Sequence, residues 1–218
     1  MMPTHDVNDQ VALLRAEIAA AAARMVAQDG ADYGTAKRKA ARRILGDAQA
    51  NSLRDALPDD AQIEEEVRQY HALFNAATQP ARLLKLRTIA LEVMERLAEY
   101  QPFLTGPVLN GSAGEHDDIR LQLFADSAKE VQIFLLNKNV NIEISESEHF
   151  KGPRHDPVET VSFLWHGEGV HAELYEQHDL RGARKKKNEQ KAGDRPARVD
   201  IDELRLLIAT EHPEHGNE

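Results

Sequence analysis

Apolar residues recur every three or four positions through the first hundred residues, and this stretch contains no clusters of β-branched residues. Such spacing predicts amphipathic helices joined by short polar segments. We expect helices over about residues 9–28, 35–45, from 58 onward and 80–97. Asp59 and Gln62 have the spacing of a reciprocal cap at the start of the third helix, and Pro80 suits the first turn of the fourth. The pattern predicts a helical N-terminal subdomain over residues 1–100.

After Tyr100 the apolar period changes from 3.6 to 2, which indicates a passage from helices to a sheet. Ile119, Leu121 and Leu123 alternate with polar residues, so we expect a strand with one buried face and one face available for chemistry. A helix and a second strand, at about residues 140–144, follow. This order predicts a β-α-β unit whose two strands are parallel neighbours.

Two further strands, over about residues 158–165 and 170–175, flank a glycine-bearing joint that is short enough for an antiparallel hairpin. The expected fold class is therefore α+β, with a helical N-terminal layer and a mixed sheet over residues 101–182. Residues 183–218 begin with a basic, aperiodic stretch, which predicts an exposed mobile segment, and end with a helix near 201–209.

Composition narrows the class of protein. The chain of 218 residues has no cysteine, which excludes a disulfide scaffold, a thiolate zinc site and a cysteine nucleophile. Its 27 basic and 37 acidic residues give a net charge of -10, so nucleic acid would have to bind at a local basic patch. No apolar run reaches the roughly 18 residues of a membrane helix, and no leader pattern opens the chain, so we expect a cytoplasmic protein without a membrane partner.

A small-residue segment before the strand at Ile119 carries the main candidate chemistry. Gly111 allows close approach of a phosphate, and the Ser112 hydroxyl can donate to phosphate oxygens. Asp118, at the start of the strand, could hold the Mg²⁺ that accompanies a nucleoside triphosphate. The three elements suit one ligand, although a Gly-Ser pair before a strand is also an ordinary turn.

These residues, with Leu104-Thr105-Gly106 before them and Leu121-Gln122-Leu123-Phe124 after them, resemble the nucleotidyltransferase superfamily of the DNA-polymerase-β type over about residues 104–182. The whole chain resembles bacterial nucleotidyltransferase-like proteins that join a helical N-terminal half to such a sheet. The resemblance implies a nucleotidyltransferase-like mixed sheet, an NTP substrate and magnesium held by carboxylates on neighbouring strands. It implies transfer of a nucleoside monophosphate to an acceptor.

The sequence departs from that pattern at the position of the second metal-binding acid, where it has Arg120. A guanidinium does not bind a cation, but it pairs with carboxylates or grips a phosphate through two hydrogen bonds. Glu173 is the best candidate for a further metal-binding acid, because it shares a strand face with His171 and Tyr175. Two functions remain open: a transferase in which Asp118 and Glu173 bind magnesium, and a degenerate nucleotide-binding or protein-interaction module.

Two basic clusters support a third, weaker hypothesis. One is the run of Lys and Arg between residues 37 and 43, and the other lies between 184 and 187. Each is typical of a solvated surface, and each is also a candidate nucleic-acid contact. Binding through such clusters should weaken steeply with added salt.

Overall fold

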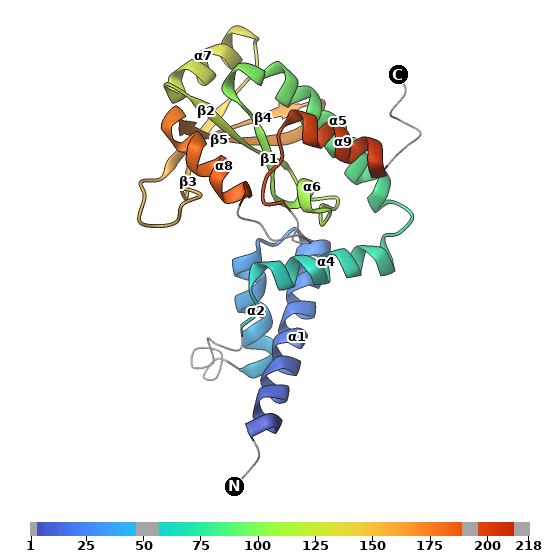
Figure 1. Cartoon of the computed structure of the whole chain (residues 1–218). Coiled ribbons are helices and arrows are strands. Elements are labelled where there is room, and N and C mark those ends of the chain that lie inside the picture. The colour runs from blue at the N-terminus through green and yellow to red at the C-terminus, as the bar shows by residue number, and fades with distance from the viewer. Residues whose placement is uncertain (1–3, 47–56, 189–195, 212–218) are drawn as a thin grey trace. The chain divides into compact units, whose positions relative to one another are not determined.

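The computed structural model describes residues 4–46, 57–188 and 196–211, with side chains described from residue 9 and not for residues 185–188. In chain order the elements are α1 (Thr4–Asp29), α2 (Tyr33–Leu45), α4 (Asp60–Phe74), α5 (Gln79–Arg96), η2 (Ala98–Tyr100), β1 (Phe103–Thr105), α6 (Gly106–Asn110), β2 (Ile119–Ala125), α7 (Ala128–Asn137), β3 (Glu143–Ser147), β4 (Val158–Trp165), β5 (Glu168–Glu176), η3 (Gln177–Asp179), α8 (Leu180–Asn188) and α9 (Ile201–Glu211) (Figure 1). The mixed α+β class expected from the sequence is confirmed.

The chain forms two compact units, one of residues 1–80 with 114–117, and the other of residues 81–113 with 118–218. We refer to them as the helical unit and the sheet unit. The division falls at Pro80, so α5 belongs to the unit of the sheet, although the sequence predicts it within the helical subdomain. The reason is its apolar stripe, because Leu86, Ala90 and Val93 pack with strand residues in one core.

The helical unit consists of α1, α2 and α4 around a small apolar core. Ile18, Ala22, Ala36, Ala40 and Ile63 are among its fully buried side chains. The alanines allow α1 and α2 to approach closely, since their side chains leave little between the two backbones. The expected reciprocal cap at the start of α4 is confirmed, with hydrogen bonds in both directions between the capping residue and the third residue of the helix.

The sheet unit contains one mixed sheet with strand order β1-β2-β5-β4-β3. The β4–β5 hairpin is confirmed as antiparallel, with Trp165 opposite Glu168. The expected parallel pairing of β2 with β3 is wrong, because β2 pairs in parallel with β5 and β3 forms the far edge against β4. Strand β3 has only exposed or half-buried side chains, as suits an edge, whereas β5 carries the apolar residues that the centre of the sheet requires.

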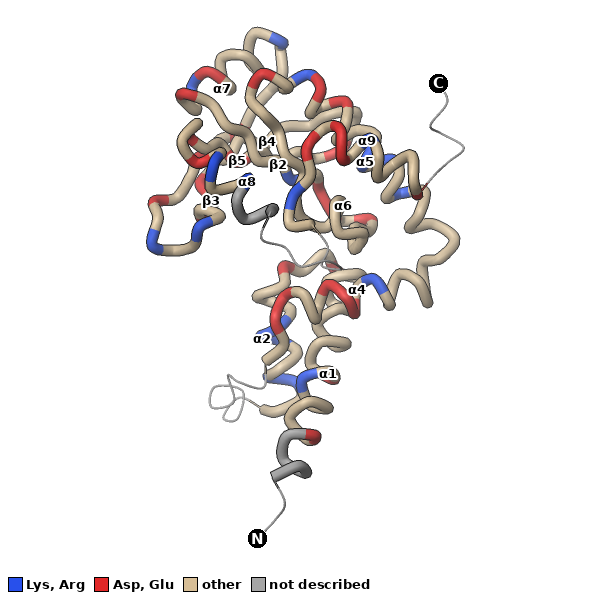
Figure 2. The backbone as a smooth tube through the Cα atoms, viewed as in Figure 1, with Lys and Arg blue, Asp and Glu red and all other residues tan. Residues whose placement is uncertain are grey.

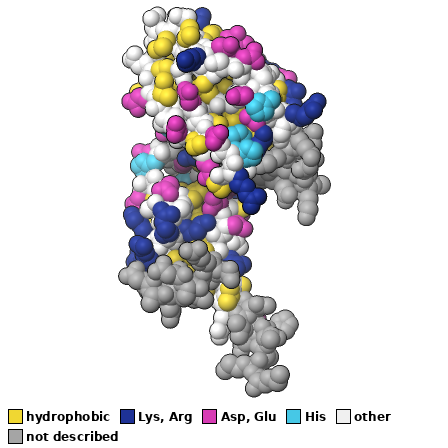
Figure 3. Space-filling view, turned by 90° about the vertical axis from the view of Figure 1, so that its left-hand side faces the viewer, with side chains coloured by type: hydrophobic (Ala, Val, Ile, Leu, Met, Phe, Trp, Pro, Cys, Tyr) yellow, Lys and Arg dark blue, Asp and Glu magenta, His cyan; other side chains and the backbone are white. Residues whose placement is uncertain are grey.

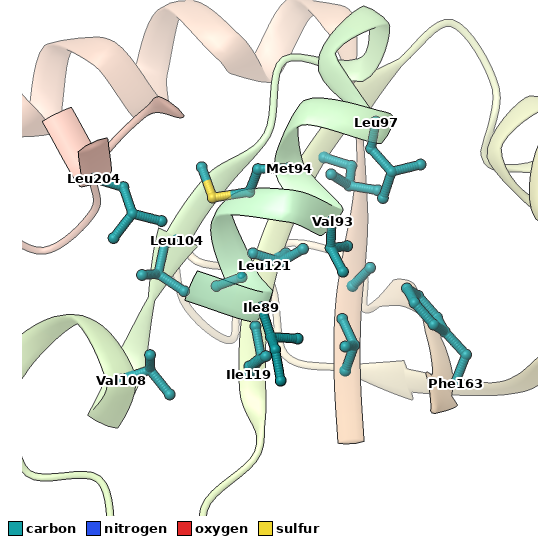
Figure 4. Close-up of a cluster of buried hydrophobic side chains, with 14 of the residues drawn as sticks. Ile89, Val93, Met94, Leu97, Leu104, Val108, Ile119, Leu121, Phe163 and Leu204 are labelled. Carbon is teal, nitrogen blue, oxygen red and sulfur yellow. The ribbon is translucent and has the colours of Figure 1, made fainter. Parts of the chain in front are cut away.

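The two faces of the sheet are covered differently. One face packs against α5, α7 and α9 in the main core, which includes Leu121, Val161, Met94 and Leu204 (Figure 4). On the other face, Phe124 and Tyr175 contact a smaller cluster that includes Ala183 of α8. The start of the basic segment is therefore helical and contacts this cluster through Ala183, while its mobility stays a prediction and residues 189–195 lie outside the described residues. No helix in the described ranges is both long and apolar enough to span a membrane.

Candidate functional site

The two predicted metal-binding acids lie on the same face of the sheet but at different levels. Asp118 lies one residue before β2, and the parallel register pairs Ile119 with Val170 and Gln122 with Glu173. Glu173 is thus four strand positions beyond the level of Asp118. At about 3.3 Å per residue, the separation along the strands is about 13 Å. The Asp118 carboxylate is hydrogen-bonded to His171 and the Glu173 carboxylate to Gln122 and Tyr175, so the two acids are not paired at one point.

Asp118 is instead part of a hydrogen-bonded chain with His171 and Ser162. Its Oδ2 lies 3.0 Å from Nε2 of His171, and Nδ1 of His171 lies 2.7 Å from Oγ of Ser162. The Asp118 carboxylate rests against Gly169, where an added Cβ would lie 2.4 Å from Oδ1. Asp118 therefore orients an imidazole, and a glycine on the neighbouring strand makes the space for its carboxylate.

The sheet register places four hydrogen-bonding side chains in one row across four strands. Thr105 is opposite Arg120, Arg120 is opposite His171, and His171 is opposite Ser162. We call these four residues the transverse row. Neighbouring strands are about 4.8 Å apart, so the row presents a donor or acceptor at regular short intervals.

Arg120 is the exposed cation of the transverse row. Its aliphatic stem lies over Gly106, where a Cβ would be 3.1 Å from Cδ of Arg120. Among the residues that the structure describes, none forms a hydrogen bond or an ion pair with its guanidinium. No described contact pairs Arg120 with Asp118 or Glu173, and its side chain is exposed.

Glu173 lies two residues beyond His171 on the same face of β5, and its carboxylate is hydrogen-bonded. Its Oε2 accepts hydrogen bonds from Nε2 of Gln122 at 3.1 Å and from the hydroxyl of Tyr175 at 2.7 Å. Burial raises the pKa of Tyr175 well above its usual range, and the nearby Glu173 charge adds to this effect. Tyr175 therefore remains a proton donor to Glu173 at any physiological pH.

A second arginine reaches the same face from the sheet edge. Val199 bridges to Leu104 with its side chain in the main core, so Arg198, one position earlier, points to the face of the transverse row. Arg198 is 5% exposed, and its guanidinium lies 4.6 Å above the ring of Phe150. Its Nε and Nη1 have no hydrogen-bond partner among the described residues, and burial lowers the pKa of the guanidinium.

Gly111 and Ser112 occupy the end of a short helix. Gly111 is the C-cap of α6, with φ of 85° and its N–H donating to the carbonyl of Pro107. Ser112 is 1% exposed, and its backbone N–H and hydroxyl both donate to Oδ1 of Asn110, at 2.9 and 2.6 Å. This geometry explains both residues as parts of a turn, and a role of the pair in holding a triphosphate stays a prediction.

The residues present do not fit the magnesium site that the resemblance implies. The two candidate acids are separated along the strands, and each already accepts hydrogen bonds from neighbouring side chains. Within the described part of the chain, no group of three or more His, Asp or Glu side chains could hold a metal ion. We therefore derive no chemical step through a metal.

The basic cluster of α2 lies in the helical unit. Figure 2 marks Lys and Arg positions along α2 in blue, and Figure 3 shows Lys and Arg side chains gathered on that unit. Lys37 is paired with Asp60 at 2.8 Å. Lys39 and Arg43 line an open groove of about 1000 Å³ with Arg24 of α1. None of these three cations has a carboxylate partner among the described residues. Nucleic-acid binding through this cluster stays a prediction.

No family model, curated protein or solved structure matches the chain. Its function must therefore be argued from its own residues. Reasoning from the sequence identified the shared face of His171 and Glu173, which the register confirms. It missed Ser162 and Thr105, because an isolated hydroxyl residue on a strand gives no signal until the neighbouring strands are known.

Proposed function

We propose that the sheet unit binds a phosphate-bearing ligand, such as a nucleotide, without transferring a nucleotidyl group. The observation that carries the proposal is the exposed guanidinium of Arg120, which lacks a partner among the described residues, at the centre of the transverse row. A guanidinium matches phosphate geometry through two parallel hydrogen bonds. The guanidinium of Arg120 therefore suits a phosphate group of the ligand.

The neighbours of Arg120 in the transverse row form a polar surface beside such a ligand. His171 and Ser162 lie one and two strands away, at about 5 and 10 Å. A phosphate gripped by Arg120 thus lies beside the imidazole ring. Both ring nitrogens are engaged, Nε2 with Asp118 and Nδ1 with Ser162, so the guanidinium supplies the directed hydrogen bonds to the phosphate. Asp118 contributes indirectly, because its hydrogen bond holds the His171 ring in one orientation.

Transfer of a nucleotidyl group is the alternative, and it is less well supported. That reaction uses two cations about 3.5–4 Å apart, clasped by shared carboxylates. Asp118 and Glu173 are too far apart along the strands for this arrangement, and Arg120 occupies the level between them. Binding of a phosphate by Arg120 needs neither paired cations nor carboxylates that share them.

The test is calorimetric titration of the full chain with ATP and ADP, with and without Mg²⁺. We expect binding in both conditions, a loss of about tenfold or more in Arg120→Gln, and partial recovery in Arg120→Lys. Arg181→Gln is the matched control, because Arg181 is also exposed and has no partner among the described residues. Equal binding by wild type and Arg120→Gln would overturn the proposal.

A second measurement separates binding from transfer. Wild type and Asp118→Asn are incubated with labelled NTP, Mg²⁺ and candidate acceptors. Nucleotide binding without a labelled product supports the proposal. A labelled product that forms with wild type and disappears with Asp118→Asn would replace it with the transferase function.

A further inference from the structure

An apolar groove lies on the helix-covered face of the sheet, away from the transverse row. It has a volume of about 280 Å³ and lies between α5, α7 and the end of β4. Figure 4 shows Val93 and Leu97 of α5 and Phe163 of the sheet at one side of the main core. Phe134 of α7 and Trp165 of β4 add aromatic surface to the lining. The groove is thus a largely apolar hollow at the margin of an otherwise close-packed core.

Two cations border this groove, and each lies over an aromatic ring. The guanidinium carbon of Arg96 is 4.9 Å from the centre of the Trp165 ring, and Nζ of Lys138 is 5.6 Å from the centre of the Phe134 ring. Both distances are within the range of cation–π attraction. The aromatic rings therefore hold the cations at the edge of the apolar hollow.

The two cations differ in their partners. Arg96 donates to Oε1 of Glu92 at 3.1 Å, so much of its charge is balanced. No carboxylate of the described residues pairs with the exposed Lys138. The positive charge of Lys138 is thus available to an anion whose apolar part enters the groove.

We propose that this groove binds a small organic carboxylate, with its apolar body between α5 and α7 and its carboxylate at Lys138. The volume equals that of about nine water molecules, at about 30 Å³ each, which suits a body of about that many non-hydrogen atoms. Ligand pockets combine such apolar walls with a few charged groups that orient the ligand. The proposal does not depend on the proposed function, because the transverse row is on the opposite face of the sheet.

The sequence provides a direct reporter for this site. Trp165 is the only tryptophan of the chain, and it lines the groove. A ligand that enters displaces water from the indole ring, so the emission of Trp165 should change and saturate. We would titrate the full chain with octanoate and, as an aromatic carboxylate of similar size, phenylpropanoate. Octanol is the uncharged comparison.

Charge variants identify the role of Lys138. We expect Lys138→Gln to bind octanoate about tenfold more weakly, since it loses one charge-assisted hydrogen bond, and Lys138→Arg to keep most of the affinity. Lys129→Gln is the matched control, because Lys129 is an exposed lysine in the first turn of α7, which Lys138 caps at the other end, and it does not line this groove. It should bind as the wild type does.

Two outcomes would overturn the inference. One is the absence of both a saturable change in emission and calorimetric heat with either carboxylate at millimolar concentration. The other is equal affinity for octanol and octanoate, or unchanged affinity in Lys138→Gln, which would exclude recognition of a carboxylate by this lysine. Circular dichroism of each variant confirms that the fold is retained.

Discussion

Glu168 stabilises the connection between the β4–β5 hairpin and α5, and its replacement should measurably destabilise the sheet unit. The hairpin turns at His166 and Gly167, which have positive φ angles of 50° and 79°. Glu168, the first residue of β5, accepts hydrogen bonds at 2.6 Å from both Arg82 and Lys85. Its side chain is only 10% exposed, so the two cations replace most of its hydration.

The magnitude follows from the pKa of Glu168. The hydrogen bond from Arg82, supported by Lys85, lowers this pKa from 4.5 to about 2 against the opposing effect of burial. At about 1.4 kcal/mol per pH unit, the fall corresponds to about 3 kcal/mol. Because Lys85 is 57% exposed and solvent screens its charge, we expect Glu168→Gln to lower the free energy of unfolding by about 2 kcal/mol at neutral pH.

The contribution of Glu168 to the free energy of unfolding changes with pH in a defined direction. A carboxyl group whose pKa is lower in the folded state than in the unfolded state stabilises the fold at pH values above its unfolded pKa. The contribution of Glu168 should therefore be complete above about pH 4.5 and disappear as the pH falls to about 2. Below that pH, wild type and Glu168→Gln should be equally stable.

The assay is urea denaturation followed by the fluorescence of Trp165, which lies in the sheet unit. Glu95→Gln is the control, since Glu95 forms an ion pair with Arg205 in which both side chains are about half exposed. Such a pair contributes about 0.5 kcal/mol or less. A loss in Glu168→Gln no larger than in this control, or a loss that persists unchanged at pH 2, would refute the reasoning.

Three further variants test other parts of the structure. Arg87→Met should cost about 3 kcal/mol in urea denaturation, because the carbonyls of residues 108 and 109 lose their buried guanidinium donor; a cost below about 1 kcal/mol would contradict this. Gly169→Ala should lower the free energy of unfolding by about 1 kcal/mol in the wild-type background, because its Cβ displaces the Asp118 carboxylate. In an Asp118→Ala background the same substitution should change this free energy very little, and equal losses in the two backgrounds would disprove the contact. The double variant Lys39→Gln with Arg43→Gln should change thermal stability by about 0.5 kcal/mol or less. If duplex DNA binds through both residues, the slope of log affinity against log salt should fall by about 1.8 in this variant, and an unchanged slope would exclude them as phosphate contacts.

The helices could be predicted from the sequence because their signals are local. The period of apolar residues predicts α2, α5 and α9 to within two residues at each end, the start of α4, and α1 apart from its first residues. The cap of α4 depends on two side chains three positions apart, so its hydrogen bonds follow from the sequence alone. The helix α8 was missed, because its polar run lacks periodic apolar residues and it docks through a few contacts such as that of Ala183.

Strand partners could not be read in the same way. The alternation of apolar residues predicts that β2 and β5 exist and which side chains share a face, but the same pattern is compatible with several strand orders. Burial decides between them, since β5 has enough apolar residues for the centre of the sheet and β3 does not. The neighbour of β2 is therefore a property of the assembled core.

For the candidate site too, local patterns in the sequence determine some features and contacts between distant residues determine the others. The sequence alone determined that Asp118 and Arg120 share one face of their strand and that His171 and Glu173 share one face of another, because the side-chain period of a strand is local. Only the tertiary structure decided that Arg120 lies in a row with His171 and Ser162, and that Asp118 and Glu173 are four strand positions apart. Register arises from contacts between residues distant in sequence, and it is register that sets the distance between two charges.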